Sequence, residues 1–352
     1  MGHTRLHDML EKLSSRSSLE REEWHYLLAV TDAHEREILR QRAAEVAVSH
    51  FGKGVFVRGL IEISSYCRNN CNYCGIRCGN TFAERYRLTK EQILKCCHQG
   101  AALGLNTFVL QGGEDVRQND EWIRDVVETI HHEFPEKAIT LSVGERCEAA
   151  YKSFFEAGAS RYLLRHETRN DAHYAQLHPS NMSSSNRRAC LETLKRIGYQ
   201  TGSGMMIGSP FQTTQHLVDD MMYLQELQPQ MIGVGPFIPA KNTPYAHFDA
   251  GCVDLTILIV SLLRLRFPHA LIPATTALVS LNPQGRLLAI QAGANVVMPN
   301  LTPTEVRDKY SIYNNKKNSG SESAQQLCLL QQSLDAIGYH IDYGRGDYTD
   351  KQ

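Results

Sequence analysis

From residue 54 onward, short apolar runs rich in β-branched residues alternate with longer stretches whose apolar residues recur at helical spacing. The runs that predict strands are VFVRGLIEIS, TFVLQGG, AITLSVGE, RYLLRHE, TGSGMMIG, MIGVGPFIP, LIPATTAL and VVMPN. Helices are expected at 89–104 and near 120–133, 147–157, 184–198, 213–227, 252–266, 284–292 and 321–337. Buried strands that alternate with helices are typical of a parallel sheet covered by helices.

The expected helix ends carry recognisable signals. Thr89, followed by Glu91 and Gln92, has the residue types that cap a helix at its first turn. Four helix exits each place a glycine just before a predicted strand, where a helix ends in the left-handed conformation. These glycines are Gly104, Gly158, Gly198 and Gly293.

Eight strand-plus-helix units in succession suit a (β/α)8 barrel of the TIM type, which we expect over residues 51–345. The structural rival is an open, doubly wound sheet. Residues 1–50 are charged and carry the apolar stripes LHDMLEKL and WHYLLAV, so they predict a helical extension packed on the barrel. The polar stretch 314–323 predicts a flexible loop before the last helix.

Composition narrows the class of protein. The chain has 352 residues, of which 42% are hydrophobic, a composition typical of globular proteins. Its formal net charge is −1, which gives no reason to expect nucleic-acid binding. No apolar run approaches the roughly 20 residues that a membrane-spanning helix needs. The first ten residues, MGHTRLHDML, lack the apolar core of a signal peptide. We therefore expect a cytoplasmic protein.

The ten cysteines are unevenly spaced. Cys67, Cys71, Cys74 and Cys78 follow the first predicted barrel strand closely, whereas the other six are scattered. Three thiolates in the pattern CxxxCxxC suit a [4Fe–4S] cluster with one iron left open. A zinc site prefers four ligands, and a zinc knuckle or a chance cysteine-rich loop is the alternative. The offset of Cys78 differs from the triplet, so we do not count it as a ligand.

The pattern CxxxCxxC, with the aromatic Tyr73 before its last cysteine, resembles the radical S-adenosylmethionine (SAM) superfamily. The strings LQGGED, TLSVGE, RYLLRHET, GPFIP, IPATTA and GANVVMPN resemble the HydE-type [FeFe]-hydrogenase maturases within it. Methylornithine synthase and biotin synthase are relatives with similar cluster loops, but RHET and IPATTA favour the HydE type. The resemblance implies that the open iron chelates the amino and carboxylate groups of SAM, and that Tyr73 covers the cluster.

Other candidate residues lie at the ends of the predicted strands. Gln111, Gly112, Gly113 and Glu114 follow the second strand, where glycines let the chain pass close to a ligand. By resemblance they form the motif for the SAM amino group. Thr140 and Ser142 alternate on the third strand, so both should face the barrel interior and need polar partners there.

Arg165 and Glu167 end the fourth strand and could be a buried ion pair. By resemblance, Glu167 binds the SAM ribose, Arg165 the substrate carboxylate, and Arg187 at the start of the next helix binds SAM; the alternative for Arg187 is a surface arginine. Met205 is expected to pack against the adenine. The remaining candidates are Thr275 and Thr276, whose hydroxyls could bind an anionic substrate, and Met298, which closes the last predicted strand near the same end of the barrel.

What the resemblance implies is an enzyme that reductively cleaves SAM to methionine and a 5′-deoxyadenosyl radical. It would act in assembly of the hydrogenase H-cluster, on a cysteine-bound Fe(CO)2(CN) precursor or a related thiol-bearing molecule. Other hydrogenase maturases and a reduced electron donor are the partners implied. Some HydE proteins have a second iron–sulfur site made of three cysteines near the C-terminus. Residues 310–323 contain none and Cys328 stands alone, so we expect one cluster.

Two rival functions remain at this point. One is another radical SAM reaction on a small amino acid, such as a mutase of the methylornithine synthase type. The other is a non-enzymatic iron–sulfur carrier or redox sensor, which would hold a cluster without turning over SAM.

Overall fold

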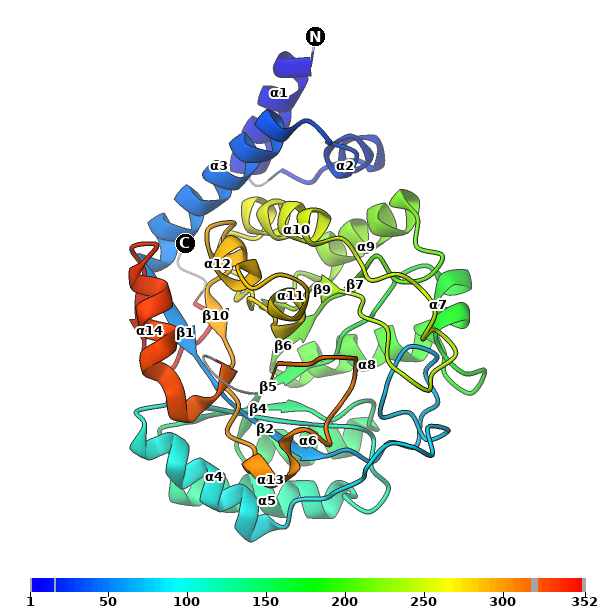
Figure 1. The fold of residues 1–352 in the computed structure, drawn as a ribbon, viewed down its shortest axis with the longest axis vertical. Coiled ribbons are helices and arrows are strands. Elements are labelled where there is room, and N and C mark those ends of the chain that lie inside the picture. Colours follow the sequence, from blue (N-terminus) through cyan, green and yellow to red (C-terminus); the bar gives the residue numbers. More distant parts are fainter. Residues whose placement is uncertain (1, 16, 318–321, 350–352) are drawn as a thin grey trace.

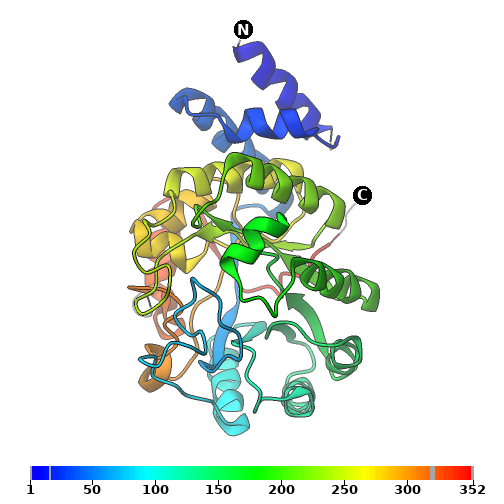
Figure 2. The same cartoon turned by 90° about the vertical axis from the view of Figure 1, so that its right-hand side faces the viewer.

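The computed structural model describes residues 2–15, 17–317 and 322–349. Its N-terminal part consists of α1 (Gly2–Ser14), α2 (Arg21–Leu28) and α3 (Ala33–Phe51). These helices stack on one side of the molecule, where α1 and α3 contact α10 (Val253–Arg266) and α2 contacts α9 (Thr214–Leu227) (Figures 1 and 2). Whether they form a separate unit ending at residue 50 stays a prediction.

Parallel strands form the centre of the molecule (Figure 1). One ladder runs in the order β2-β3-β4-β5-β6-β8, and another in the order β10-β1-β11. The bounds are β1 (Gly54–Val57), β2 (Gly59–Ser64), β3 (Thr107–Gly112), β4 (Ala138–Ser142), β5 (Ala159–Leu163), β6 (Gln200–Ser203), β8 (Met231–Ile232), β10 (Val296–Val297) and β11 (His340–Asp342).

Backbone bridges join the two ladders into a ring. Met231 pairs with Leu271, and Pro273 pairs with Val296 of β10, which itself pairs with Phe56 of β1. Because β1 continues directly into β2, eight parallel segments surround one axis. The barrel prediction is therefore confirmed and the open sheet is wrong. A short pair, β7 (Met206–Ile207) and β9 (Gly235–Pro236), extends the wall at the carboxyl end.

Helices cover the outside of the ring (Figure 1). They are α4 (Lys90–Ala102), α5 (Asp120–Glu133), α6 (Glu148–Glu156), α7 (Asp171–Leu177), α8 (Ser184–Ile197), α9, α10, α11 (Thr276–Leu281), α12 (Gly285–Ile290), α13 (Thr304–Arg307) and α14 (Leu327–Asp335). Thr89 and Gln92 form the expected capping box on α4. The four exit glycines have φ values between +83° and +116°. None of the described helices is both long and apolar enough to cross a bilayer.

Two predicted elements differ from the structure. The run LIPATTAL joins the ring only at Leu271 and Pro273. The extended stretch ends at Thr275, because this residue is the N-cap of α11. Thr276 therefore lies in a helix, not on a strand. The last helix begins at Leu327 after a 3-10 turn at Ala324–Gln326. Of the predicted loop 314–323, residues 318–321 lie outside the described residues.

Alternation along the strands decides which side chains line the barrel. Ile61 and Ile63 of β2 pack in the core between strands and helices, as do Phe108 and Leu110 of β3. The residues between them must face the interior, because successive side chains of a strand point to opposite faces. At the carboxyl end this places Glu62, Gln111, Ser142 and Arg165 around the mouth of the barrel, with Thr140 one layer below.

Candidate active site

The three candidate cysteines lie on the loop between β2 and α4. Cys67, Cys71 and Cys74 are free thiols of intermediate burial. The guanidinium of Arg85 donates hydrogen bonds to four carbonyl groups of this loop, those of Ser65, Ile76, Arg77 and Asn80. One side chain thus fixes the loop on both sides of the cysteine triplet.

The thiols form a cluster of mutually interacting groups. Burial raises the pKa of all three, and that of Cys74 to about 12. The charges of Cys74 and Cys67 raise the pKa of Cys71 further. Among the residues that the structure describes, no three His, Cys, Asp or Glu side chains converge on a single metal ion. Separated thiolates on one loop suit a multi-iron cluster, in which each thiolate binds a different iron.

Two glycines allow close approach around these cysteines. A Cβ atom on Gly113 would lie 2.3 Å from the Tyr66 carbonyl oxygen and 2.7 Å from the Cys67 Cβ. A Cβ atom on Gly75 would lie 2.1 Å from the Ser311 carbonyl oxygen. The Gly75 amide donates to the Ile312 carbonyl at 2.9 Å. The cysteine loop therefore rests on β3 at one side and on the segment 308–317 at the other.

The turn after β3 is held by its two acidic residues. Glu114 Oε2 accepts from Arg68 Nε at 2.9 Å, and its Oε1 accepts from the Glu145 amide at 3.0 Å. Asp115 accepts hydrogen bonds from Arg87 and Ser64. Burial raises the pKa of this carboxyl group, but these hydrogen bonds lower it more, so the pKa lies below its ordinary value. Both carboxylates are thus engaged by the chain, while Gln111 to Gly113 stay half-buried.

Three buried polar atoms at the barrel have no hydrogen-bond partner among the described residues. They are Thr140 Oγ1, Thr275 Oγ1 and Arg165 Nε, and Thr140 as a whole is only 2% exposed. Buried polar atoms are normally satisfied, so these three groups fit a polar ligand that is not part of the chain. Thr276 differs, because its hydroxyl donates to Glu322 at 2.9 Å.

Arg165 and Glu167 are paired with each other at 2.8 Å. Glu167 has a φ of +64°, an unusual backbone conformation that occurs most often at functional sites. Arg187 is only 8% exposed, which excludes the surface alternative. Its Nε lies 2.6 Å from Glu145 Oε1 in an ion pair whose geometry falls short of a hydrogen bond.

A polar network outside the barrel holds the Glu167 turn. His166 Nδ1 lies 2.9 Å from Ser203 Oγ, and its Nε2 lies 3.2 Å from Asp220 Oδ1. The same Asp220 oxygen accepts from the Arg169 amide at 2.5 Å. His166, Ser203 and Asp220 are each at most 1% exposed. Asp220 was not predicted, because it lies on α9, far from this turn along the chain, and no local pattern marks it.

Tyr73 and the methionines lie in apolar surroundings. The Tyr73 hydroxyl lies 3.1 Å from Nε2 of His178, whose Nδ1 lies 3.0 Å from the Tyr174 carbonyl. Burial, with the charge of Arg187, lowers the pKa of His178 to about 3, so a neutral ring can accept from Tyr73 while donating to Tyr174. Met205 is fully buried, and Met298 packs against Met231, Leu271 and Val296.

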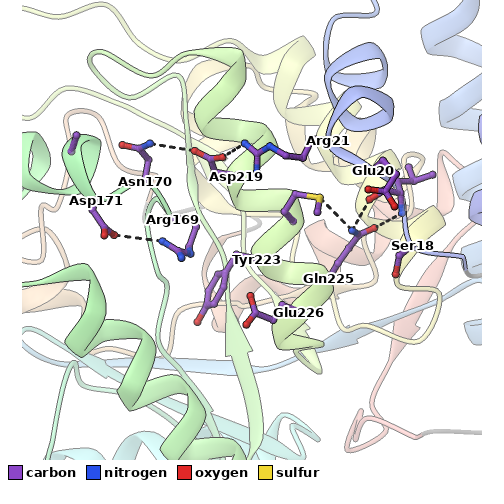
Figure 3. A pocket seen from close by; sticks show the side chains of 13 residues that line it. Ser18, Glu20, Arg21, Arg169, Asn170, Asp171, Asp219, Tyr223, Gln225 and Glu226 are labelled. Carbon is purple, nitrogen blue, oxygen red and sulfur yellow. Dashed lines mark hydrogen bonds and ion pairs between the residues drawn. The ribbon is translucent and has the colours of Figure 1, made fainter.

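A cavity of about 750 Å³ lies outside the barrel, between the segment 18–21 and the helices α7 and α9 (Figure 3). The ion pair Arg21–Asp219 crosses it, and Arg169 pairs with Asp171 on one of its sides. None of the site residues predicted from the sequence lines this cavity. A smaller cavity of about 340 Å³ borders the cysteine loop at Gly75 and Ile76.

Comparisons with known proteins agree with this geometry. Residues 61–224, which include the cysteine triplet, match the model of the Radical SAM superfamily. The chain is 42% identical over 309 residues to the [FeFe] hydrogenase maturase subunit HydE of Thermotoga maritima, covering 88% of each chain. It is 29% identical over 291 residues to 3-methylornithine synthase of Methanosarcina acetivorans, covering 82% of this chain and 81% of the relative.

Solved structures show the same fold. The crystal structure of methylornithine synthase (PylB) has a TM-score of 0.83 at 25% identity and covers 97% of this chain and 98% of its own. The crystal structure of HydG, a maturase of the [FeFe]-hydrogenase, has a TM-score of 0.81 at 20% identity. The match covers 97% of this chain and 76% of the HydG chain.

Proposed function

Because this chain belongs to the family of the [FeFe] hydrogenase maturase subunit HydE, within the radical SAM superfamily, we propose that it acts in assembly of the hydrogenase H-cluster with SAM and one [4Fe–4S] cluster. The chain is a radical SAM enzyme by this membership. The observation that carries the proposal is the loop after β2, which carries Cys67, Cys71 and Cys74 at the carboxyl end of the barrel, where active sites of this fold lie.

In this proposal the three cysteines would hold the cluster, which would supply the reductive cleavage of bound SAM. Tyr73, whose hydroxyl lies 3.1 Å from His178 Nε2, would cover the cluster. The main chain of Gln111 to Gly113 and the carboxylate of Glu167 line the place for SAM. Glu114 stabilises the turn beside it, because its carboxylate is already bound by Arg68.

Further residues complete the place for SAM. Arg187 and Ser142 contribute polar groups to it, and Met298 contributes apolar surface. Met205, predicted to pack against the adenine, is 0% exposed in the core and can only support this place from behind. The barrel wall excludes water that would quench a radical.

The proposed substrate is a cysteine-bound Fe(CO)2(CN) precursor or a related thiol-bearing small molecule. Thr140, Arg165 and Thr275 support it, because each has a buried polar atom that no group in the described part of the chain satisfies. Thr276 is a weaker candidate, since its hydroxyl already donates a hydrogen bond to Glu322. Other hydrogenase maturases and a reduced electron donor are the partners proposed.

The test is anaerobic reconstitution with iron and sulfide, followed by incubation with SAM and a reductant. We expect 5′-deoxyadenosine and about four irons per chain. A cluster without 5′-deoxyadenosine would indicate a carrier or sensor instead. Close to eight irons would contradict the single cluster. Cys78→Ala should leave the iron content unchanged, whereas Cys71→Ala should abolish SAM cleavage.

The likeness of fold to methylornithine synthase supports a second candidate, a mutase that acts on a small amino acid. Lysine incubated with SAM and the reduced enzyme distinguishes the two candidates. Formation of 3-methylornithine would favour the mutase. Activation of an immature [FeFe]-hydrogenase only when this chain is added to its other maturases would favour the maturase.

A further inference from the structure

Glu62 is a buried carboxylate at the mouth of the barrel. It lies near the carboxyl end of β2, shortly before Cys67, and is 0% exposed. Its neighbours Ile61 and Ile63 pack outward, so its side chain faces the interior. The Glu62 amide donates to Thr302 Oγ1 at 2.8 Å, and the Asn300 side chain donates to Glu62 Oε2 at 3.0 Å. The carboxylate is therefore held in one orientation, with Oε1 left for another donor.

The donor on Oε1 is the ammonium group of Lys316. Lys316 belongs to the irregular segment 308–317, and its side chain is only 8% exposed. Its Nζ also lies 5.0 Å from the centre of the Tyr310 ring. A carboxylate and an aromatic face together are the groups with which proteins bind an ammonium ion. The mouth of the barrel thus contains a formed ammonium site, occupied by the chain itself.

Stability alone is a poor explanation for this ion pair. Removing two charges from water costs about as much as their attraction returns, so apolar residues would serve a purely structural role equally well. The pair also lies at the end of the barrel where substrates bind, beside Gln111 and close to the cysteine loop. An incoming ammonium could replace that of Lys316 without leaving Glu62 uncompensated.

We propose that Glu62 binds a primary ammonium group of the substrate, and that Lys316 occupies this position until the substrate replaces it. The inference rests on the proposed function and narrows its substrate to molecules of the amino-acid type. The ammonium would bind Glu62, while Arg165, Thr140 and Thr275 supply donors for the carboxylate. Segment 308–317, freed at Lys316, would be the part of the mouth that admits the ligand.

Two small molecules test the ammonium requirement directly. L-Cysteine and 3-mercaptopropionate share a thiol and a carboxylate and differ in the α-ammonium group. Calorimetric titration of the cluster-loaded protein with SAM present should show about tenfold tighter binding of L-cysteine, the difference that one charge-assisted hydrogen bond supports. Glu62→Gln should weaken the binding of L-cysteine to the level of 3-mercaptopropionate and leave the latter unchanged.

Lys316→Met tests the replacement. It removes the competing ammonium and leaves Glu62 without a counter-charge, so L-cysteine should bind about tenfold more tightly than to the wild type. The affinity for 3-mercaptopropionate should not rise. The neighbouring, exposed Lys317 gives the matched control, since Lys317→Met should change neither affinity.

Equal affinity of the wild type for both ligands would overturn the inference. So would unchanged or weaker binding of L-cysteine to Lys316→Met, which would make the pair structural. If Glu62→Gln does not fold, the affinities of the wild type and of Lys316→Met for the two ligands still test the inference. Formation of 5′-deoxyadenosine is measured in the same samples. Its absence would contradict the proposed function, whereas SAM cleavage without discrimination between the ligands would contradict only this inference.

Discussion

At the scale of single residues, the turn at Glu167 depends on a histidine and a carboxylate outside the barrel. The Ser203 hydroxyl can donate to the Leu164 carbonyl at 3.3 Å, which leaves His166 Nδ1 as the donor to Ser203. The other ring nitrogen, Nε2, lies 3.2 Å from Asp220 Oδ1, and burial raises the pKa of this carboxyl group. This pair keeps Glu167 in its left-handed conformation and Arg165 directed into the barrel.

Asp220→Asn should therefore raise the KM for SAM about tenfold, with a smaller effect on kcat. The substitution keeps the shape of the side chain but removes the charge that binds His166, and a charge-assisted hydrogen bond is worth about 1.5–3 kcal/mol. Steady-state kinetics of 5′-deoxyadenosine formation measure this. Asp219→Asn is the matched control, because Asp219 pairs with Arg21 outside the barrel. A loss of thermal stability with an unchanged KM would contradict the positioning role.

Glu167→Ala and Arg187→Ala should each weaken SAM binding about tenfold or more and leave the iron content unchanged. Each variant removes a charged hydrogen-bonding group worth about 1.5–3 kcal/mol. Titration of the reconstituted protein with SAM, combined with iron analysis, separates the two effects. If SAM affinity stays at the wild-type value in both variants, the two residues serve only the ion pairs with Arg165 and Glu145.

The sequence alone predicts the positions of candidate residues whose spacing is local. Cys67, Cys71 and Cys74 share one loop, and Thr140 is placed inside by alternation along one strand. Glu62 was not predicted, because a glutamate between two isoleucines on a strand looks the same whether it faces water or a barrel interior. Its partner Lys316 lies 254 residues away, and a contact of that separation follows from barrel closure, not from a local pattern.

At the scale of elements, the cysteine loop has no helix or strand between residues 65 and 85, so its shape depends on side chains. Arg85 binds its carbonyl groups, and Arg87 joins its end to Asp115 after β3. A loop held at defined points can present three thiols in one arrangement before any metal arrives. This lowers the ordering cost of cluster binding.

Arg85→Lys should speed up cluster loss without preventing the barrel from folding. A lysine ammonium cannot reach four carbonyl groups at once, because it lacks the planar fork of the guanidinium. Loss of two such bonds weakens the loop by about 3 kcal/mol. The rate at which a chelator removes iron under anaerobic conditions measures the effect. The exposed Arg117 provides the control, and a chelation rate in Arg85→Lys equal to that in Arg117→Lys would refute the loop argument.

Helices and strands were predicted well where one element buries one regular face. The segment 271–281 was not, because Ile272 and the two threonines, all β-branched, favour a strand by composition. In the structure Thr275 precedes the first turn of α11, and Thr276 binds Glu322. The strand signal and the helix-start signal overlap there, and packing decides between them.

At the scale of the whole molecule, the C-terminal segment closes the amino end of the barrel. β11 adds to β1, and Asp347 pairs with the fully buried Arg161 at 2.6 Å. The Gly346 carbonyl accepts from the buried Arg58 at 3.1 Å. Although burial opposes it, the hydrogen bond from Arg161 keeps the pKa of Asp347 below its ordinary value.

Asp347→Asn should lower the free energy of unfolding at pH 7 by about 2 kcal/mol, the range for a hydrogen bond to a charged group. Because the folded-state pKa lies below the unfolded value of about 3.9, the stabilisation is complete above about pH 4 and is lost as the pH falls through the folded-state pKa. Urea unfolding of the cluster-free proteins from pH 7 to pH 3 should show the free energies of unfolding of the wild type and Asp347→Asn converge as the pH falls. The surface variant Asp335→Asn should follow the wild type, and a constant difference between the two proteins would contradict this account.

The pairing of β1 with both β10 and β11 has a consequence for the order of events during synthesis. The ribosome completes the cysteine loop early, but β1, which continues into β2 ahead of this loop, acquires its partners only when residues near 296 and 340 emerge. At roughly 5–20 residues per second, the three thiols wait at least ten seconds or so beside an open barrel. We therefore expect the proposed iron loading to follow synthesis of the whole chain. A C-terminal truncation or fusion that disturbs β11 should then slow it, although β11 lies at the opposite end of the barrel.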